Sequence, residues 1–179
     1  METYIALLRG INVSGQKLIK MADLINHLHE LKFSNVRTYI QSGNILFENK
    51  KTENKLLALK IEKKILEKYG FVVPTIVLTS MELKNVFEQN PYIRNSEKEL
   101  IRIYTAFLSD EPSNENLEKL SNTDFTPEEF IQHGKVLYGY SPDGFGNAKL
   151  NNNFIEKSLK VKATTRNWKT VCKLVELSL

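Results

Sequence analysis

The order of apolar segments in the first 80 residues is the feature that most constrains the fold of this chain. A short apolar strand at residues 4–10 is followed by helical periodicity at 20–33 and by two β-rich arms within 36–48. A second helical segment at 54–70 and another strand at 71–80 complete the series. The order strand, helix, two strands, helix, strand is typical of the split β-α-β, or ferredoxin-like, fold.

Glycine and proline refine this prediction. Ser42 and Gly43 lie between the two β-rich arms and predict a hairpin with a two-residue turn, because glycine accepts the positive φ that tight turns need. Pro74 lacks a backbone N–H, so the strand at 71–80 is expected at a sheet edge or with a bulge.

The second half of the chain partly repeats the first. YIQSGNILF, residues 39–47, and FIQHGKVLY, residues 130–138, match in residue type at every position. This match predicts an internal duplication, although the frequent use of glycine and aromatic residues in hairpins is an alternative explanation. The segment at 164–177 has a helical stripe that Thr164 or Thr165 would cap, so a helix is expected where the first half has its fourth strand.

We therefore predict an α+β protein of two ferredoxin-like units that arose by internal duplication, the second ending in an extra helix. The expected boundaries are a first unit at 1–82, a polar linker with a short helix at 83–99, and a second, atypical unit at 100–179. Both arrangements, one shared sheet or two separate sheets, are compatible with this pattern.

Composition favours a soluble cytoplasmic protein. Cys172 is the only cysteine, so an intramolecular disulfide and a cysteine metal cluster are both excluded. The start of the sequence does not resemble a signal peptide, and no apolar run approaches the length of a membrane span, so no membrane partner is expected. The net charge of +4 favours anionic partners without identifying one.

The stretch LLRGINVSGQK, residues 7–17, resembles a nucleotide-binding loop only superficially. Gln16 precedes Lys17 where a P-loop has its second glycine directly before lysine, and Leu18 stands in place of the magnesium-binding hydroxyl. The G-x-G-x-x-G fingerprint of dinucleotide-binding proteins is also absent from the sequence.

The predicted topology nevertheless brings polar residues together. The first two strands of a split β-α-β unit run parallel with the third between them, so residue 10 and the hairpin tip at residue 43 should lie at one end of the sheet, beside the start of the first helix. Polar loops also occur without any function, and Arg9 could simply pair with a carboxylate. We predict a site for a small anion formed by Arg9, Gly10, Asn12, Lys17, Lys20, Gln41, Ser42, Gly43 and Asn44.

No catalytic residue and no metal ligand is predicted. His27 and His29 are two positions apart on a helix and face different directions, and His133 has no acid near it in sequence. Cys172 lies on an apolar stripe, and Asp143 is explained as a turn residue. The sequence thus leaves enzymatic activity uncertain and any cofactor unknown.

Three longer segments carry a family resemblance: YIALLRGINVSGQKLIKMADL, NVRTYIQSGNILFE and ATTRNWKTVCKL, with PDGFGNAKL in support. They resemble the uncharacterised bacterial family called domain of unknown function 1697, over residues 4–177. The resemblance implies an α+β protein of ferredoxin-like units without an established activity, and it adds Arg166 and Asn167 to the predicted ligand-binding residues. Ser14 replaces a usual glycine, and Ala148 replaces a common serine before Lys149, which argues against a Ser-Lys nucleophile.

Three functions follow in order of preference. The first is binding of a small anionic ligand such as a nucleotide or a phosphorylated metabolite. The second is nucleic-acid binding, suggested by the positive charge, the repeated fold and the aromatic strands. The third is an enzyme of unknown reaction. The oligomeric state is unknown at this point.

Overall fold

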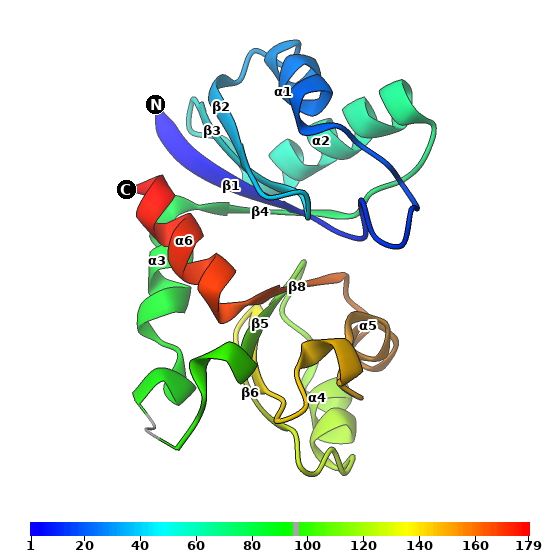
Figure 1. Cartoon of the computed structure of the whole chain (residues 1–179), viewed down its shortest axis with the longest axis vertical. Helices are drawn as coiled ribbons and strands as arrows, with labels where there is room; N and C mark the ends of the chain where they lie inside the picture. The colour runs from blue at the N-terminus through cyan, green and yellow to red at the C-terminus, as the bar shows by residue number, and fades with distance from the viewer. Residues whose placement is uncertain (95–96) are drawn as a thin grey trace. The chain divides into compact units, whose positions relative to one another are not determined.

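The structure, a computed structural model, describes residues 1–94 and 97–179 and shows in them two four-stranded antiparallel sheets and six α-helices (Figure 1). The chain divides into two compact units, Met1–Asn85 with Leu174–Leu179, and Val86–Lys173. It passes from one unit to the other within α3 (Ser80–Glu88) and again within α6 (Trp168–Ser178). The part of the predicted linker at positions 95 and 96 lies outside the described residues.

The first unit has the strand order β2-β3-β1-β4, with every neighbouring pair antiparallel. Because β3 lies between β1 and β2 and is antiparallel to both, β1 and β2 run parallel to each other, as predicted. Pro74 directly precedes β4, which forms an edge of the sheet, so that prediction is confirmed. The elements are β1 (Glu2–Leu8), α1 (Met21–His29), β2 (Ser34–Tyr39), β3 (Asn44–Asn49), α2 (Asn54–Tyr69) and β4 (Thr75–Thr79).

Helices α1 and α2 bury one face of this sheet. Apolar side chains at i, i+4 and i+8 of α2 and at i, i+4 of α1 form the helix side of the core. The intervening residues of β1, Ile5 and Leu7, are fully buried on the opposite face. A central strand with two buried faces needs a nearly continuous apolar run, which explains the sequence YIALL. The core residues on the helix-covered face include Tyr4, Ala6, Leu8, Leu24, Leu28, Phe47, Leu57, Ile61 and Ile65.

The second unit has the strand order β6-β7-β5-β8, which repeats the spatial order of the first. Helices α4 and α5 cover one face through Leu120, Ile155 and Leu159, which pack with alternate residues of β5. Its elements are η1 (Pro91–Arg94), η2 (Leu100–Arg102), β5 (Ile103–Leu108), α4 (Asn114–Ser121), β6 (Glu129–His133), β7 (Val136–Tyr140), η3 (Phe145–Asn147), α5 (Asn152–Leu159) and β8 (Ala163–Asn167).

The prediction that a helix replaces the fourth strand of the second unit is wrong. Residues 163–167 form β8, in which Thr164 pairs with Phe107 of β5. Neither threonine caps α6; instead the side-chain oxygen of Asn167 accepts a hydrogen bond from the backbone N–H of Thr170 at 2.8 Å. A five-residue strand of polar and β-branched residues directly before a helix has little apolar alternation, and the helical stripe after it dominates the pattern.

The predicted two-residue turn in the first hairpin is also wrong. The connection from β2 to β3 contains four residues, 40–43, whereas the second hairpin has a two-residue turn of Gly134 and Lys135. Ile40 adopts φ +51°, a conformation that a β-branched residue rarely takes and that no sequence pattern indicates.

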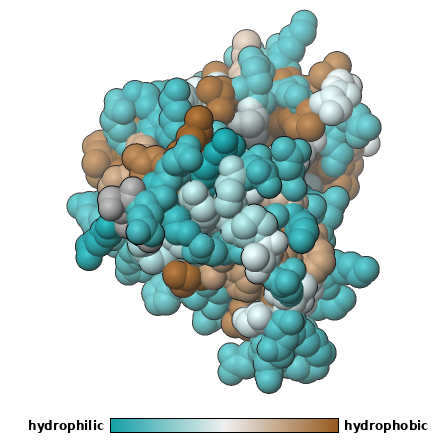
Figure 2. Space-filling view, turned by 60° about the horizontal axis from the view of Figure 1, so that its bottom comes forward, coloured by the Kyte–Doolittle hydropathy of each residue, from teal (hydrophilic) through white to brown (hydrophobic). Residues whose placement is uncertain are grey.

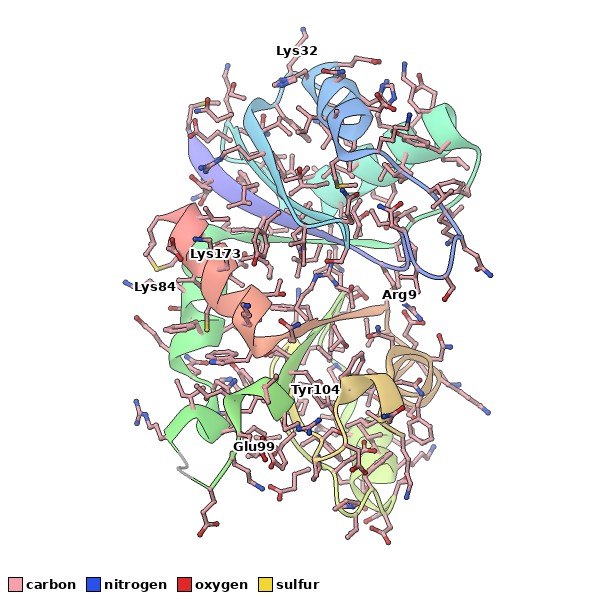
Figure 3. All side chains as sticks on the ribbon, viewed as in Figure 1. Arg9, Lys32, Lys84, Glu99, Tyr104 and Lys173 are labelled. Carbon is pink, nitrogen blue, oxygen red and sulfur yellow. The ribbon has the colours of Figure 1, made fainter. Side chains whose placement is uncertain are left out.

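Gly139 in β7 gives a direct test of packing in the second unit. A Cβ atom at this position would lie 2.1 Å from Cζ of Tyr104, a ring that is 1% exposed and that Figure 3 labels. We expect Gly139→Ala to lower the free energy of unfolding by about 3 kcal/mol, because a well-packed core cannot take an added methyl group without displacing the ring. Urea denaturation provides the measurement. Gly146→Ala, with no atom near the added Cβ, should change stability by less than about 1 kcal/mol; equal effects of the two substitutions would contradict this packing.

Glu30 connects the end of α1 to α2 through ion pairs with Lys68 at 3.0 Å and Lys64 at 3.2 Å, and it contacts His27 at 3.3 Å. Hydrogen bonds from Lys68, His27 and Lys64, in that order, lower the pKa of Glu30 from 4.5 to about 2. A depressed carboxyl pKa in the folded state stabilises the protein above the unfolded pKa, and this contribution is lost as the pH falls from 4.5 through 2.

We therefore expect wild type to be more stable than Glu30→Gln at pH 7 and this difference to shrink steadily between pH 4.5 and pH 2. The effect should be modest because the carboxylate is exposed to water. Urea denaturation of both proteins across this pH range measures the difference. A stability difference that stays constant with pH would contradict the role given to these ion pairs.

Candidate functional site

The connection after β1 and the hairpin turn before β3 contact each other at one end of the first sheet. The backbone N–H of Leu8 donates to the carbonyl of Gly43 at 2.8 Å. The side-chain amide of Asn12 donates to the carbonyl of Gln41 at 2.9 Å. The geometric expectation that the two tips meet is thus confirmed within the first unit.

Asn12 organises this meeting. Its Nδ2 donates to the carbonyls of Gln41 and Ile19, and its Oδ1 accepts from the N–H of Ile19 at 2.9 Å. We call these three hydrogen bonds the Asn12 clamp. One nitrogen atom thus binds the carbonyls of Ile19 and Gln41, so these two carbonyl groups lie close together. The backbones of Lys20 and Ser42, the residues that follow them, are therefore close to each other as well.

The backbone around the clamp is unusually rich in left-handed conformations. Non-glycine residues with positive φ are normally a few per cent of a chain, and they concentrate at functional sites when they are strained. Ile40, on the hairpin side, has φ +51° and a side chain that is 48% exposed. In the β1–α1 connection, positive φ occurs at Gly10, Asn12, Ser14, Gly15 and Lys17.

Several predicted ligand-binding side chains are used inside the fold. Lys17 donates from its ammonium group to the carbonyl of Val72 at 2.8 Å, which ties the loop to the segment before β4. Asn44 is fully buried, and its amide donates to the carbonyl of Tyr39 and to the hydroxyl of Ser42. Gly43 has φ +81°, and a Cβ there would lie 2.7 Å from Cβ of Leu8. These residues therefore stabilise the fold of the two loops.

Other predicted residues remain accessible at the surface. Gly10, Lys20, Gln41 and Ser42 are exposed, and Arg9, which directly follows β1 (Figure 3), is half-buried. Lys20 is the N-cap residue of α1, and its side chain makes no capping hydrogen bond. The amide groups of the first helical turn therefore begin beside Lys20, where the helix dipole is positive.

Arg166 and Asn167, the remaining predicted residues, belong to the second unit. Arg166 is buried and donates to Oγ1 of Thr164 and to the carbonyl of Thr165, each at 2.9 Å. Burial lowers the pKa of its guanidinium to about 10, so the group is still charged at neutral pH. Asn167 caps α6. A ligand-binding role for these two residues stays a prediction.

Within positions 1–94 and 97–179, no three His, Cys, Asp or Glu side chains gather closely enough to hold a metal ion. Burial raises the pKa of the Cys172 thiol, which disfavours the nucleophilic thiolate form. Among the helices of these same residues, none combines the length and apolar character needed to cross a bilayer.

The sequence did not indicate a pocket that the structure shows in the second unit. A pocket of about 490 Å³ lies between residues 88–94 and the β6–β7 hairpin and is lined by Asn90, Arg94, Ile131, His133 and Tyr138 among others. Asn90 is 2% exposed, and its Nδ2 has no hydrogen-bond partner among the described residues. Asn90 lies in a polar stretch that reads as linker, and no local pattern distinguishes a buried asparagine there.

The fold and the site define an α+β protein with two four-stranded antiparallel sheets and a polar loop cluster at one end of the first. A family model described as a protein of unknown function, DUF1697, matches residues 1–138, and the chain belongs to this family. A solved structure, "The structure of conserved bacterial protein SP0830 from Streptococcus pneumoniae", is similar with a TM-score of 0.76 and 21% sequence identity, covering 99% of each chain. At this identity the similarity shows the fold alone. A comparison with curated proteins found no match.

Because Asn12 makes all three hydrogen bonds of the clamp, we expect its substitution alone to have a large effect on stability. We expect Asn12→Ala to lower the free energy of unfolding by about 2–4 kcal/mol, because it removes three hydrogen bonds of about 1 kcal/mol each and leaves the N–H of Ile19 without its acceptor. Chemical denaturation and the exchange rate of the Ile19 amide are the measurements. Ser14→Ala is the matched control, since Ser14 also has positive φ in the same loop. An equal loss of unfolding free energy in both variants would contradict the stabilising role of the Asn12 clamp.

Proposed function

We propose that this protein binds a small anionic ligand, such as a nucleotide or a phosphorylated metabolite, where the β1–α1 connection meets the β2–β3 turn. The Asn12 clamp is the single observation that carries the proposal. It places Lys20 and Ser42 on neighbouring backbone positions at the start of α1. The bond between Leu8 and Gly43 brings Arg9, the residue after Leu8, to the same turn.

The groups at this position suit an anion. Arg9 and Lys20 supply positive charge, the hydroxyl of Ser42 and the amide of Gln41 supply donors, and a helix N-terminus favours negative charge. Asp23 in the first turn of α1 opposes such a ligand with its own negative charge. The strained backbone at Ile40 supports the proposal because strain of this kind is retained mainly where the surrounding structure has a use for it.

We also propose that the two units are duplicated ferredoxin-like units, residues 1–82 and 100–179, and that the anion site of Arg9, Lys20 and Ser42 belongs to the first. The equivalent connection of the second unit, between β5 and α4, contains Asp110 and Glu111 and no arginine or lysine. Its charge is therefore unfavourable for an anion. A cytoplasmic location is part of the proposal, in keeping with the single cysteine.

Nucleic-acid binding and an enzymatic reaction stay as weaker alternatives. The net charge of +4 supports the first. The strand aromatics that suggested base stacking are placed in cores, however: Tyr4 stacks on Phe47 at 5.6 Å, and Tyr104 packs on Phe145 at 4.8 Å. Buried rings are not platforms for bases.

Isothermal titration with inorganic phosphate, pyrophosphate, nucleotides and sugar phosphates tests the anion site. We expect wild type to bind at least one of these, and Arg9→Ala and Lys20→Ala each to weaken binding by about 5- to 30-fold, since a charge-assisted hydrogen bond contributes about 1–2 kcal/mol. Asp23→Asn should strengthen binding a few-fold, because it removes an opposing charge.

Lys50→Ala is the matched control, since Lys50 is an exposed lysine that follows β3 at the other end of that strand. Its affinity should equal that of wild type. Absence of binding to every probe, or equal losses in Lys20→Ala and Lys50→Ala, would contradict the site. Binding of single-stranded RNA that falls steeply with salt, without binding of small phosphates, would favour the nucleic-acid alternative instead.

A further inference from the structure

Strand β6 is an edge of the second sheet and pairs with β7 in a regular ladder from Glu129–Tyr140 to His133–Val136. The pairing of β7 with β5, on the other side of β7, shows which backbone groups of β7 are directed toward β6. The N–H of Leu108 donates to the carbonyl of Lys135 at 2.9 Å, so residues 135, 137 and 139 direct their backbone groups toward β5. Residues 136, 138 and 140 therefore direct theirs toward β6.

It follows that the backbone groups of Glu129, Ile131 and His133 bond to β7, and those of Phe130 and Gln132 point to the open side. No group of residues 1–94 or 97–179 is seen to bond to these outward N–H and C=O groups. Unpaired groups in a row at a sheet edge are a template for another strand.

The equivalent edge strand of the first unit is protected. The pairing of β2 with β3 shifts register between Ser34 and Arg37, and Asn35 has φ +50°, so this strand is bulged. The guanidinium of Arg37 also donates to the carbonyl of Leu177 at 3.1 Å. Bulges and charged side chains are the usual ways to block pairing at an edge. Strand β6 has no register shift, and its central exposed residue is an isoleucine.

The exposed side chains of one β6 strand are complementary to those of a second, antiparallel β6 strand. Glu129, Ile131 and His133 lie on one face of the strand, and all three are exposed, Ile131 by 46%. In an antiparallel pair of two β6 strands centred on Ile131, each Glu129 stands opposite the partner's His133, and the two isoleucines face each other. Lys98 bonds Oε1 of Glu129, so the partner's histidine would approach Oε2.

We propose that β6 pairs with β6 of a second copy of this chain, giving a symmetric dimer with a continuous antiparallel sheet. The outward groups fit this register: Phe130 and the partner's Gln132 form hydrogen-bonded pairs on both sides of a non-hydrogen-bonded Ile131 pair. A two-fold axis at Ile131 makes the interface isologous, so the assembly closes at two chains. This inference is independent of the anion site.

Sedimentation equilibrium over a wide range of protein concentrations tests the dimer. We expect wild type to form a monomer–dimer equilibrium and Ile131→Lys to weaken association at least about tenfold, because two lysines would face each other on the dyad. Ile101→Lys is the matched control, since Ile101 is 81% exposed in the same unit, and it should associate like wild type. A wild type that stays monomeric, or an Ile131→Lys dimer of undiminished strength, would overturn the proposal.

Cysteine trapping and a charge exchange test the register. In a Cys172→Ser background, Ile131→Cys should form disulfide-linked dimers under mild oxidation, because the Cα atoms of a non-hydrogen-bonded pair lie about 4.5 Å apart. Ile101→Cys should not. Glu129→His and His133→Glu alone should each weaken the dimer, and the two together should restore it. Equal trapping at positions 131 and 101, or no restoration in the double variant, would overturn this register.

Discussion

The side chain of Asn12 holds together the loops at one end of the sheet in the first unit. Its amide group bonds the carbonyls of Ile19 and Gln41 and the N–H of Ile19, so the loop after β1, the approach to α1 and the hairpin turn become one assembly. The backbone contact between Leu8 and Gly43 lies beside it, in a space that excludes any side chain at position 43. The conformation of the loop, including its many left-handed residues, is held by these hydrogen bonds together with the buried side chains of Ile11 and Ile19.

The two units share a strand order but differ in the loop after their first strand and in their edge strands. The first has a basic loop and a bulged, protected edge, and the second has an acidic connection and a regular edge strand. On the face shown in Figure 2, hydrophilic residues predominate and apolar residues are scattered among them. Binding in such a protein would depend on positioned polar groups and strand edges more than on a broad apolar surface. The two proposals assign ligand binding to the first unit and self-association to the second.

Part of this arrangement could be read from the sequence. The buried run at residues 4–8, the helical periodicity and Pro74 gave the order of the first unit and its edge strand, because these signals are local. The fourth strand of the second unit was missed because Thr164 and Thr165 suit both a strand and a helix cap. The sequence did not indicate that the side chains of Lys17 and Asn44 donate hydrogen bonds to carbonyls within the fold. The bond of Lys17 reaches Val72, far along the chain, and a contact of this kind has no sequence period.

The most direct test of the central claim is a map of backbone amide chemical shifts of the whole protein during titration with pyrophosphate. We predict that the largest shift changes occur at Arg9, Gly10, Ser42 and the first turn of α1, and that those of the second unit stay small. Large changes elsewhere with none at these amides would contradict an anion site built on the Asn12 clamp.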